Sequence, residues 1–243
     1  MPGWCRTLIF ICLLALWSAV VTLSFALILL FYQISRQKDR LELTARIMAN
    51  IYGRGCMLIV SPWVKVKTEN LRALHAPCIV AANHLSMLDL TCLSFLPEKN
   101  MCVLIKSWPA DMPFMGLFVR KAGYINIDEL SFAEVARRID EEIKKQSMIV
   151  VFPEGSRSSD GKLKRLRSGA FRLAVKTGLP VYPLRYSGTN QAFPKGSFSI
   201  RPARVTMRLY GKIIPPQSNN ELYDSRAHKQ LGHQVKACLQ EAA

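Results

Sequence analysis

A histidine and a carboxylate stand five positions apart in residues 83–89, which read Asn-His-Leu-Ser-Met-Leu-Asp. The apolar run 78–82 before them is typical of a buried strand, so His84 and Asp89 would lie where a strand gives way to a helix. A neutral imidazole can take a proton from an alcohol, and a carboxylate beside it can fix the tautomer and stabilise the imidazolium. Neighbours on one helical face are three or four residues apart. We therefore expect His84 in the loop, with Asp89 folding back onto it from the first helical turn.

The same seven residues also fit a purely structural interpretation. Ser86 would cap the helix, Asp89 would be the acidic residue three positions on, and His84 would be an ordinary loop residue. On these residues alone the two interpretations are evenly matched.

A second polar segment, Phe-Pro-Glu-Gly-Ser-Arg-Ser at 152–158, follows the apolar run 148–151. Ligands of open α/β sheets bind at the carboxyl ends of strands, which makes this segment a candidate binding loop. Gly155 lets a ligand approach the backbone, and the planar guanidinium of Arg157 suits a phosphate. The alternative is a solvated surface turn. A nucleotide-triphosphatase loop is rejected because Leu163 stands where Ser or Thr should bind magnesium.

Short apolar runs alternate with helical patterns through most of the chain. Strands are expected at 57–60, 64–66, 78–82, 102–105, 124–127, 148–152, 181–185 and 204–210, with helices at 86–95, 131–145 and 166–177 between several of them. Ser131 with Glu134 three residues on predicts the start of one helix, and Gly178 predicts the end of another. This order predicts an α/β fold with a mixed sheet flanked by helices.

The N-terminal run 7–32 is almost wholly apolar and uncharged. As a helix it would be about 39 Å long, more than the roughly 30 Å hydrocarbon core of a bilayer, so we expect an uncleaved membrane anchor that spans the bilayer or lies in one leaflet. Only Arg6 precedes the run, whereas Arg36, Lys38 and Arg40 follow it soon after. The positive-inside tendency predicts a cytoplasmic (inner) membrane protein whose catalytic domain faces the cytoplasm.

The whole chain divides into three predicted segments. Residues 1–54 would form the anchor and an amphipathic helix over 34–51, residues 55–214 the catalytic domain, and residues 215–243 a polar, peripheral helical tail. The net charge of +16 implies an anionic partner such as a membrane surface, a phosphorylated substrate or a nucleic acid. His228 and His233 in the tail form no zinc signature, so no metal is expected.

Taken together, these segments resemble the phospholipid/glycerol acyltransferase family, in particular its bacterial 1-acyl-sn-glycerol-3-phosphate (lysophosphatidic acid) acyltransferases. The resemblance covers residues 57–190 and four motifs in the family's order: the box 83–89, a stretch from Lys106 to Gly123, the segment 152–158, and Val-Tyr-Pro at 181–183. Family members often carry an arginine after a Gly-x-Ile-x-Ile-Asp stretch, whereas here Glu129 follows the aspartate.

The resemblance implies an acyltransferase of phospholipid biosynthesis that moves a fatty acyl group to the free hydroxyl of 1-acylglycerol-3-phosphate and forms phosphatidic acid. His84 would be the general base and Asp89 its orienting partner. The substrate-binding residues would be Lys106, Glu154, Gly155, Ser156 and Arg157. The acyl donor would be acyl-CoA or acyl carrier protein, the other partners would be membrane lipids, and no metal or tightly held cofactor is implied.

Two alternatives remain. Glu129 in place of the arginine favours an O-acyltransferase for a lyso-aminolipid such as lyso-ornithine lipid. The charge of +16 alone would fit a membrane-tethered protein that binds anionic ligands. Nucleic acid is not expected as a partner, because the basic stretch 157–185 contains only two aromatic residues, Phe171 and Tyr182, that could stack on bases.

Overall fold

The computed structural model describes residues 2–35, 40–112, 115–216 and 225–240. Seven strands form one sheet in the order β1-β7-β6-β2-β5-β3-β4. The strands are β1 (Val64–Glu69), β2 (Cys78–Ala82), β3 (Met101–Ile105), β4 (Ile125–Asn126), β5 (Met148–Val151), β6 (Val181–Ser187) and β7 (Ala203–Leu209). All neighbouring strands pair in parallel except β6 and β7, which are antiparallel, so the sheet is mixed as predicted.

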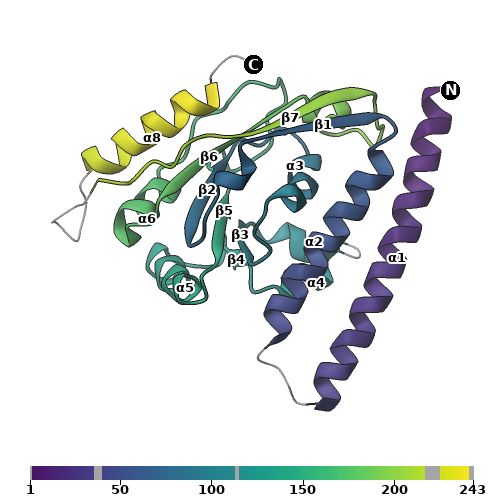
Figure 1. The fold of residues 1–243 in the computed structure, drawn as a ribbon, viewed down its shortest axis with the longest axis horizontal. Coiled ribbons are helices and arrows are strands. Elements are labelled where there is room, and N and C mark those ends of the chain that lie inside the picture. Colours follow the sequence, from purple (N-terminus) through teal and green to yellow (C-terminus); the bar gives the residue numbers. More distant parts are fainter. Residues whose placement is uncertain (1, 36–39, 113–114, 217–224, 241–243) are drawn as a thin grey trace.

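Helices cover both faces of the sheet (Figure 1). They are α1 (Gly3–Ser35), α2 (Leu41–Val60), α3 (Leu88–Cys92), α4 (Met115–Lys121), α5 (Phe132–Lys144), α6 (Gly169–Thr177), α7 (Thr189–Ala192) and α8 (Ser225–Gln240), with short 3-10 turns η2 (Leu71–Ala73), η3 (Leu93–Phe95) and η4 (Trp108–Asp111). The predicted capping box of Ser131 and Glu134 starts α5, and Gly178 ends α6 in the left-handed conformation.

The central strands are buried on both sides, and their residues alternate between two hydrophobic cores. Val80 of β2 belongs to the core beneath α2 and α3, whereas its neighbours Ile79 and Ala81 belong to the core beneath α5, α6 and α8. Every residue of β2 and β5 is buried, which explains why these strands are unbroken apolar runs in the sequence.

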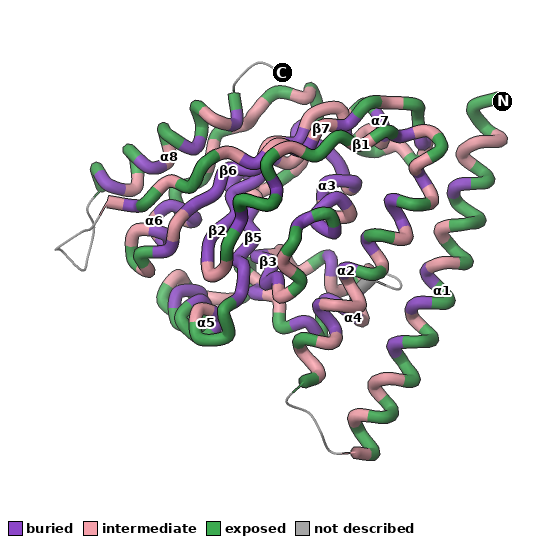
Figure 2. The backbone as a smooth tube through the Cα atoms, viewed as in Figure 1, coloured by how far each residue is buried: buried purple, intermediate pink, exposed green. Residues whose placement is uncertain are grey.

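Two predictions about secondary structure are wrong. The apolar run 57–60 is the last turn of α2 and not a strand, because Met57 and Val60 continue the buried face that Ala45 begins. The C-terminal tail is not peripheral over α8, because Leu231, Val235 and Leu239 enter the core beside α6. Figure 2 shows this alternation of buried and exposed residues along α8.

The predicted three-segment division stays a prediction. Helix α2 runs without a break across the expected boundary at residues 54 and 55, so the second helix of the N-terminal region also packs on the domain that contains the sheet. The expected amphipathic helix 34–51 coincides with α2 from residue 41. Its residues 36–39, among them two of the basic residues used for the positive-inside prediction, lie outside the described part of the chain.

A buried arginine ties α2 to the sheet domain. The guanidinium of Arg46, which is 1% exposed, donates hydrogen bonds to Glu142 at 2.7 Å, to Asn100 at 2.7 Å and to the carbonyl oxygen of Ala122 at 2.9 Å. Burial alone would raise the pKa of Glu142, but hydrogen bonds from Arg46, Ser147 and Lys145 outweigh it and lower that pKa to about 2. Arg46 therefore links elements that are far apart in sequence.

We expect Arg46→Met to lower the free energy of unfolding by about 3–5 kcal/mol, because it leaves the buried carboxylate of Glu142 without its main partner. Chemical denaturation of the detergent-solubilised protein measures this. Arg137→Met, which breaks the exposed ion pair with Glu141, is the control and should cost less than about 1 kcal/mol. Equal losses in Arg46→Met and Arg137→Met would contradict the role given to Arg46.

Stability should also depend on pH. Because the pKa of Glu142 falls from 4.5 to about 2 on folding, the stabilisation from this carboxylate is present above pH 4.5 and is lost as the pH falls toward 2.

Candidate active site

The loop after β2 is fixed by an asparagine that continues the backbone pairing of the sheet. The side-chain nitrogen of Asn83 donates to the carbonyl oxygen of Tyr186 at 3.0 Å, and its oxygen accepts from the backbone N–H of Tyr186 at 2.7 Å. A carboxamide carries the donor and acceptor of a peptide group, so it extends the β2–β6 ladder by one position. His84 therefore leaves the sheet from a defined point.

Asp89 gathers the loop around His84. Its Oδ2 atom lies 2.9 Å from Nδ1 of His84 and accepts the backbone N–H groups of Leu85 at 2.6 Å and Ser86 at 2.8 Å. Asp89 is fully buried and lies in the first turn of α3, as the sequence predicts. A carboxylate is an acceptor, so the tautomer that fits this contact carries its proton on Nδ1. The Nε2 atom is then free of a proton and can act as a base.

The imidazole ring is held on a second side by Phe152. The two ring centroids are 4.3 Å apart and the planes are inclined by 31°. The side chain of His84 remains 13% exposed, so a ligand can reach a ring that is otherwise packed. Phe152 opens the predicted segment 152–158, but the sequence does not indicate its contact with the histidine ring.

Glu154 joins the two predicted motifs through the backbone. Its Oε1 atom accepts the N–H of His84 at 2.7 Å, and its Oε2 atom accepts the N–H of Lys164 at 2.8 Å. The backbone N–H of Ser158 also donates to the carbonyl oxygen of His84, at 2.8 Å. Burial raises the pKa of Glu154, while these backbone hydrogen bonds oppose the shift. Both carboxylate oxygens of Glu154 therefore accept hydrogen bonds from the backbone of the loops.

The other predicted binding residues extend from the same loop. Gly155 has a φ of +69°, and a Cβ there would lie 2.8 Å from Nε of Arg167, so both conformation and space favour glycine. Ser156 accepts a hydrogen bond from Nζ of Lys164 at 3.0 Å. Arg157 is half-buried, and within the described part of the chain its guanidinium has no hydrogen-bond partner.

Lys106 is the one predicted residue without a contact to these loops. It follows β3 directly and is half-buried, and no hydrogen bond of its side chain occurs among the described residues. Next to it, Ser107 makes a long contact of 3.4 Å with the carboxylate of Glu129. The residue that departs from the family pattern therefore lies beside Ser107, which follows Lys106 in the chain.

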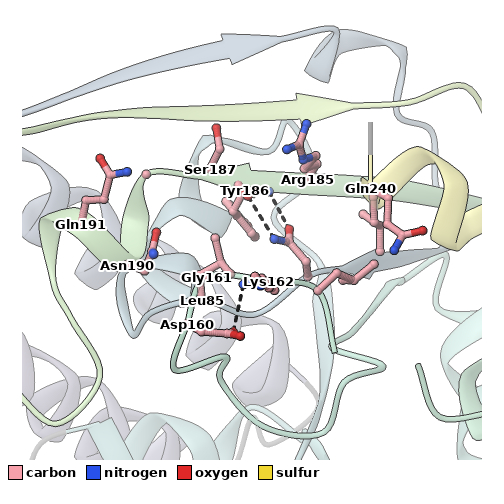
Figure 3. Close-up of a pocket in the computed structure, with 14 residues that line it drawn as sticks. Leu85, Asp160, Gly161, Lys162, Arg185, Tyr186, Ser187, Asn190, Gln191 and Gln240 are labelled. Atoms are coloured by element: carbon pink, nitrogen blue, oxygen red, sulfur yellow. Dashed lines mark hydrogen bonds between the residues drawn. The ribbon is translucent and has the colours of Figure 1, made fainter. Parts of the chain in front are cut away.

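A polar pocket of about 640 Å³ opens beside Asn83 and Leu85 (Figure 3). Asp160 and Lys162 line it from the loop after β5, opposite Arg185 and Ser187 of β6, and Gln240 reaches it from α8. Within the described residues, no group of three or more His, Cys, Asp or Glu side chains could hold a metal ion. The pocket offers hydrogen bonds and positive charge to a polar ligand.

Comparison with known proteins identifies the family. The family model described as Acyltransferase matches residues 64–187, about half of the chain, and this range contains both loops. The chain belongs to the acyltransferase family.

Named relatives extend this comparison. A chloroplastic 1-acyl-sn-glycerol-3-phosphate acyltransferase of Brassica napus is 35% identical over 54% of this chain and 39% of that protein. The enzyme of the same name from Cocos nucifera is 30% identical over 70% of this chain and 57% of that protein, and the one from Pseudomonas aeruginosa is 29% identical over 68% and 63%. The chain thus spans less than two thirds of the length of these relatives.

The fold also resembles a solved structure. The crystal structure of the 1-acyl-sn-glycerophosphate acyltransferase PlsC from Thermotoga maritima matches with a TM-score of 0.62 over 91% of this chain and 95% of that chain, at 22% sequence identity. This likeness supports the α/β fold of the acyltransferase domain together with its N-terminal helices.

We expect Glu154→Gln to lower the free energy of unfolding by about 1–3 kcal/mol, because its NH₂ group would face a backbone N–H donor of either His84 or Lys164. Chemical denaturation and hydrogen exchange of these two amides measure the effect. Glu134→Gln is the matched control, since glutamine also serves in an exposed capping box. Unchanged protection of both amides in the Glu154 variant would show that the bridge contributes nothing.

Proposed function

We propose that this acyltransferase transfers a fatty acyl group from a thioester to the free hydroxyl of 1-acylglycerol-3-phosphate and so forms phosphatidic acid. The observation that carries the proposal is the 2.9 Å contact between Nδ1 of His84 and Asp89, because it leaves Nε2 of a partly exposed histidine as a base. The names of the relatives from Cocos nucifera and Pseudomonas aeruginosa support this choice of acceptor.

The reaction needs no acyl-enzyme. Nε2 of His84 takes the proton of the acceptor hydroxyl as its oxygen bonds to the thioester carbonyl carbon. The tetrahedral intermediate then collapses, the carbon–sulfur bond breaks, and the imidazolium returns the proton to the departing thiolate. Asp89 stabilises the imidazolium between these steps. Lys106 or backbone N–H groups stabilise the oxyanion, and no metal or tightly held cofactor takes part.

A small apolar cavity could take a short part of the acyl chain. About 100 Å³ of space lies between α2, η3, β3 and α4, and Leu90 of α3, the helix that contains Asp89, also lines it. Its walls include Leu90, Leu93, Met101, Val103, Phe118 and Val119. The few methylene groups that fit there would be shielded from water.

Membrane association fits the lipid acceptor. Helix α1 is long and apolar enough to cross a bilayer. It also contacts the acyltransferase body near both ends: Nε of Arg6 donates to the carbonyl oxygen of Ile200 at 2.8 Å, and the rings of Phe25 and Phe118 lie 4.8 Å apart. These contacts support an anchor that lies beside the body in one leaflet. The basic residues that follow the apolar run favour a body at the cytoplasmic face of the inner membrane.

A second acceptor class is favoured by one observation. Glu129 places a carboxylate beside Ser107 and Lys106, where an amine-bearing lyso-aminolipid such as lyso-ornithine lipid could form an ion pair. A phosphate would instead be repelled by that carboxylate and would rely on Arg157.

We expect His84→Ala to lower the rate of phosphatidic acid formation about 10²–10⁴-fold without loss of folded protein, since general-base help is removed. The assay follows labelled acyl-CoA and 1-acylglycerol-3-phosphate on purified membranes. His75→Ala, at an exposed histidine before β2, is the control and should retain activity. Near-normal turnover of folded His84→Ala would contradict the mechanism.

If Arg157 binds the acceptor phosphate, Arg157→Lys should raise the KM for 1-acylglycerol-3-phosphate about tenfold, because one ammonium replaces a bidentate guanidinium. The donor KM should change much less. The same kinetics with lyso-ornithine lipid provide the comparison, and Arg137→Lys on α5 is a surface control. An equal rise in KM for both acceptors would assign Arg157 a structural role and favour the aminolipid.

A further inference from the structure

A basic groove of about 1050 Å³ lies between the loop 163–168 and α8. Its floor includes Phe171 of α6, and Gly232 lets α8 approach that ring so closely that an added Cβ would lie 3.1 Å from it. Figure 1 shows α8 beside α6 on one face of the sheet. The packing of the two helices therefore fixes the width of the groove.

Both walls of this groove are positively charged. The cationic side chains that line it are Lys164, Arg165, Arg167, Lys229 and Lys236. Its one acidic residue, Glu154, already uses both carboxylate oxygens for backbone N–H groups. Four of the five cations are exposed, and none of the five has an acidic partner within the described residues. Like charges that face each other across a hollow favour a polyanionic ligand.

The groove adjoins the catalytic loop on the side away from the apolar cavity. Glu154 lines the groove and accepts the N–H of His84 at 2.7 Å. Leu163 and Leu166 of the groove pack on the core beneath α5, α6 and α8, whereas Leu93 and Val103 of the apolar cavity belong to the opposite core. A donor whose thioester lies at His84 could therefore direct its acyl chain to one face of the sheet and its polar end to the other.

We propose that this groove binds the phosphorylated nucleotide of CoA, so that acyl-CoA is the donor; this rests on the acyl transfer proposed above. The nucleotide carries a diphosphate and a separate 3′-phosphate, which matches cations on two walls of a hollow better than on one flat surface. A planar lipid surface would contact only the outer rims. The pantetheine arm spans from the groove, past Glu154, to the thioester at His84.

The test uses the full chain in detergent micelles and the double variant Lys229→Gln/Lys236→Gln. The control is Lys144→Gln/Lys176→Gln, which removes the same charge from exposed positions on α5 and α6 outside the groove. Calorimetry measures the Kd of CoA, and kinetics measure the KM of acyl-CoA and of S-acyl-pantetheine, which lacks the nucleotide.

We expect the groove variant to raise the CoA Kd and the acyl-CoA KM about tenfold. This is the effect of losing two partly exposed ion pairs between the lysines and the phosphates of CoA. The groove variant should leave the KM of S-acyl-pantetheine unchanged. The control variant should leave the CoA Kd and both KM values unchanged. An unaltered CoA Kd, or an equal rise for both donors, would overturn the proposal.

The same experiments would also detect a ligand of the groove other than CoA. If the protein used acyl carrier protein and bound no CoA, or if the variant weakened binding only to vesicles of phosphatidylglycerol, the assignment to CoA would be wrong. If CoA bound with the expected dependence on Lys229 and Lys236 but no acyl group were transferred, the groove assignment would stand and the proposed function would fail.

Discussion

Two buried carboxylates that accept backbone N–H groups hold the candidate site together. Asp89 folds the loop after β2 around His84, and Glu154 ties this loop to the one that follows β5. A buried carboxylate is costly without hydrogen bonds, so each of these residues is compatible with few loop conformations. Both oxygens of Glu154 and Oδ2 of Asp89 have such bonds, whereas Oδ1 of Asp89 has no partner among the described residues. The position of the imidazole is therefore determined by the same hydrogen bonds that keep the two carboxylates stable in the interior.

The mixed sheet explains why these loops meet. Strands β2, β5, β3 and β6 are parallel, so their carboxyl ends lie at the same end of the sheet. A loop of the site follows each strand there. Strand β7 turns back antiparallel to β6 and pairs with β1, which extends the sheet without adding a loop to that edge. The sheet thus concentrates polar chemistry at one end while its two faces stay apolar.

Local signals predicted much of the fold. The strands β2 and β5, the capping box at Ser131 and the stop at Gly178 depend on residues close in sequence, and all were predicted correctly. The run 57–60 was misassigned because a four-residue apolar stretch has no decisive period. The contact of His84 with Asp89 could be anticipated from their spacing. The partners of Glu154 and the buried network of Arg46 could not, because they join segments 10 to 100 residues apart with no pattern that links them.

The acyl-CoA donor proposed above has two ends of opposite solubility, and the structure offers a separate surface for each. An acyl thioester carries a hydrocarbon that must avoid water and a polar end that must stay in it. In this structure the apolar cavity opens among α2, η3 and α4, next to the apolar helix α1, whereas the cationic residues gather around α6 and α8. The two lie over opposite faces of the sheet, and Glu154, which lines the cationic groove, accepts the N–H of His84, so the histidine stands at the end of the sheet from which both faces can be approached.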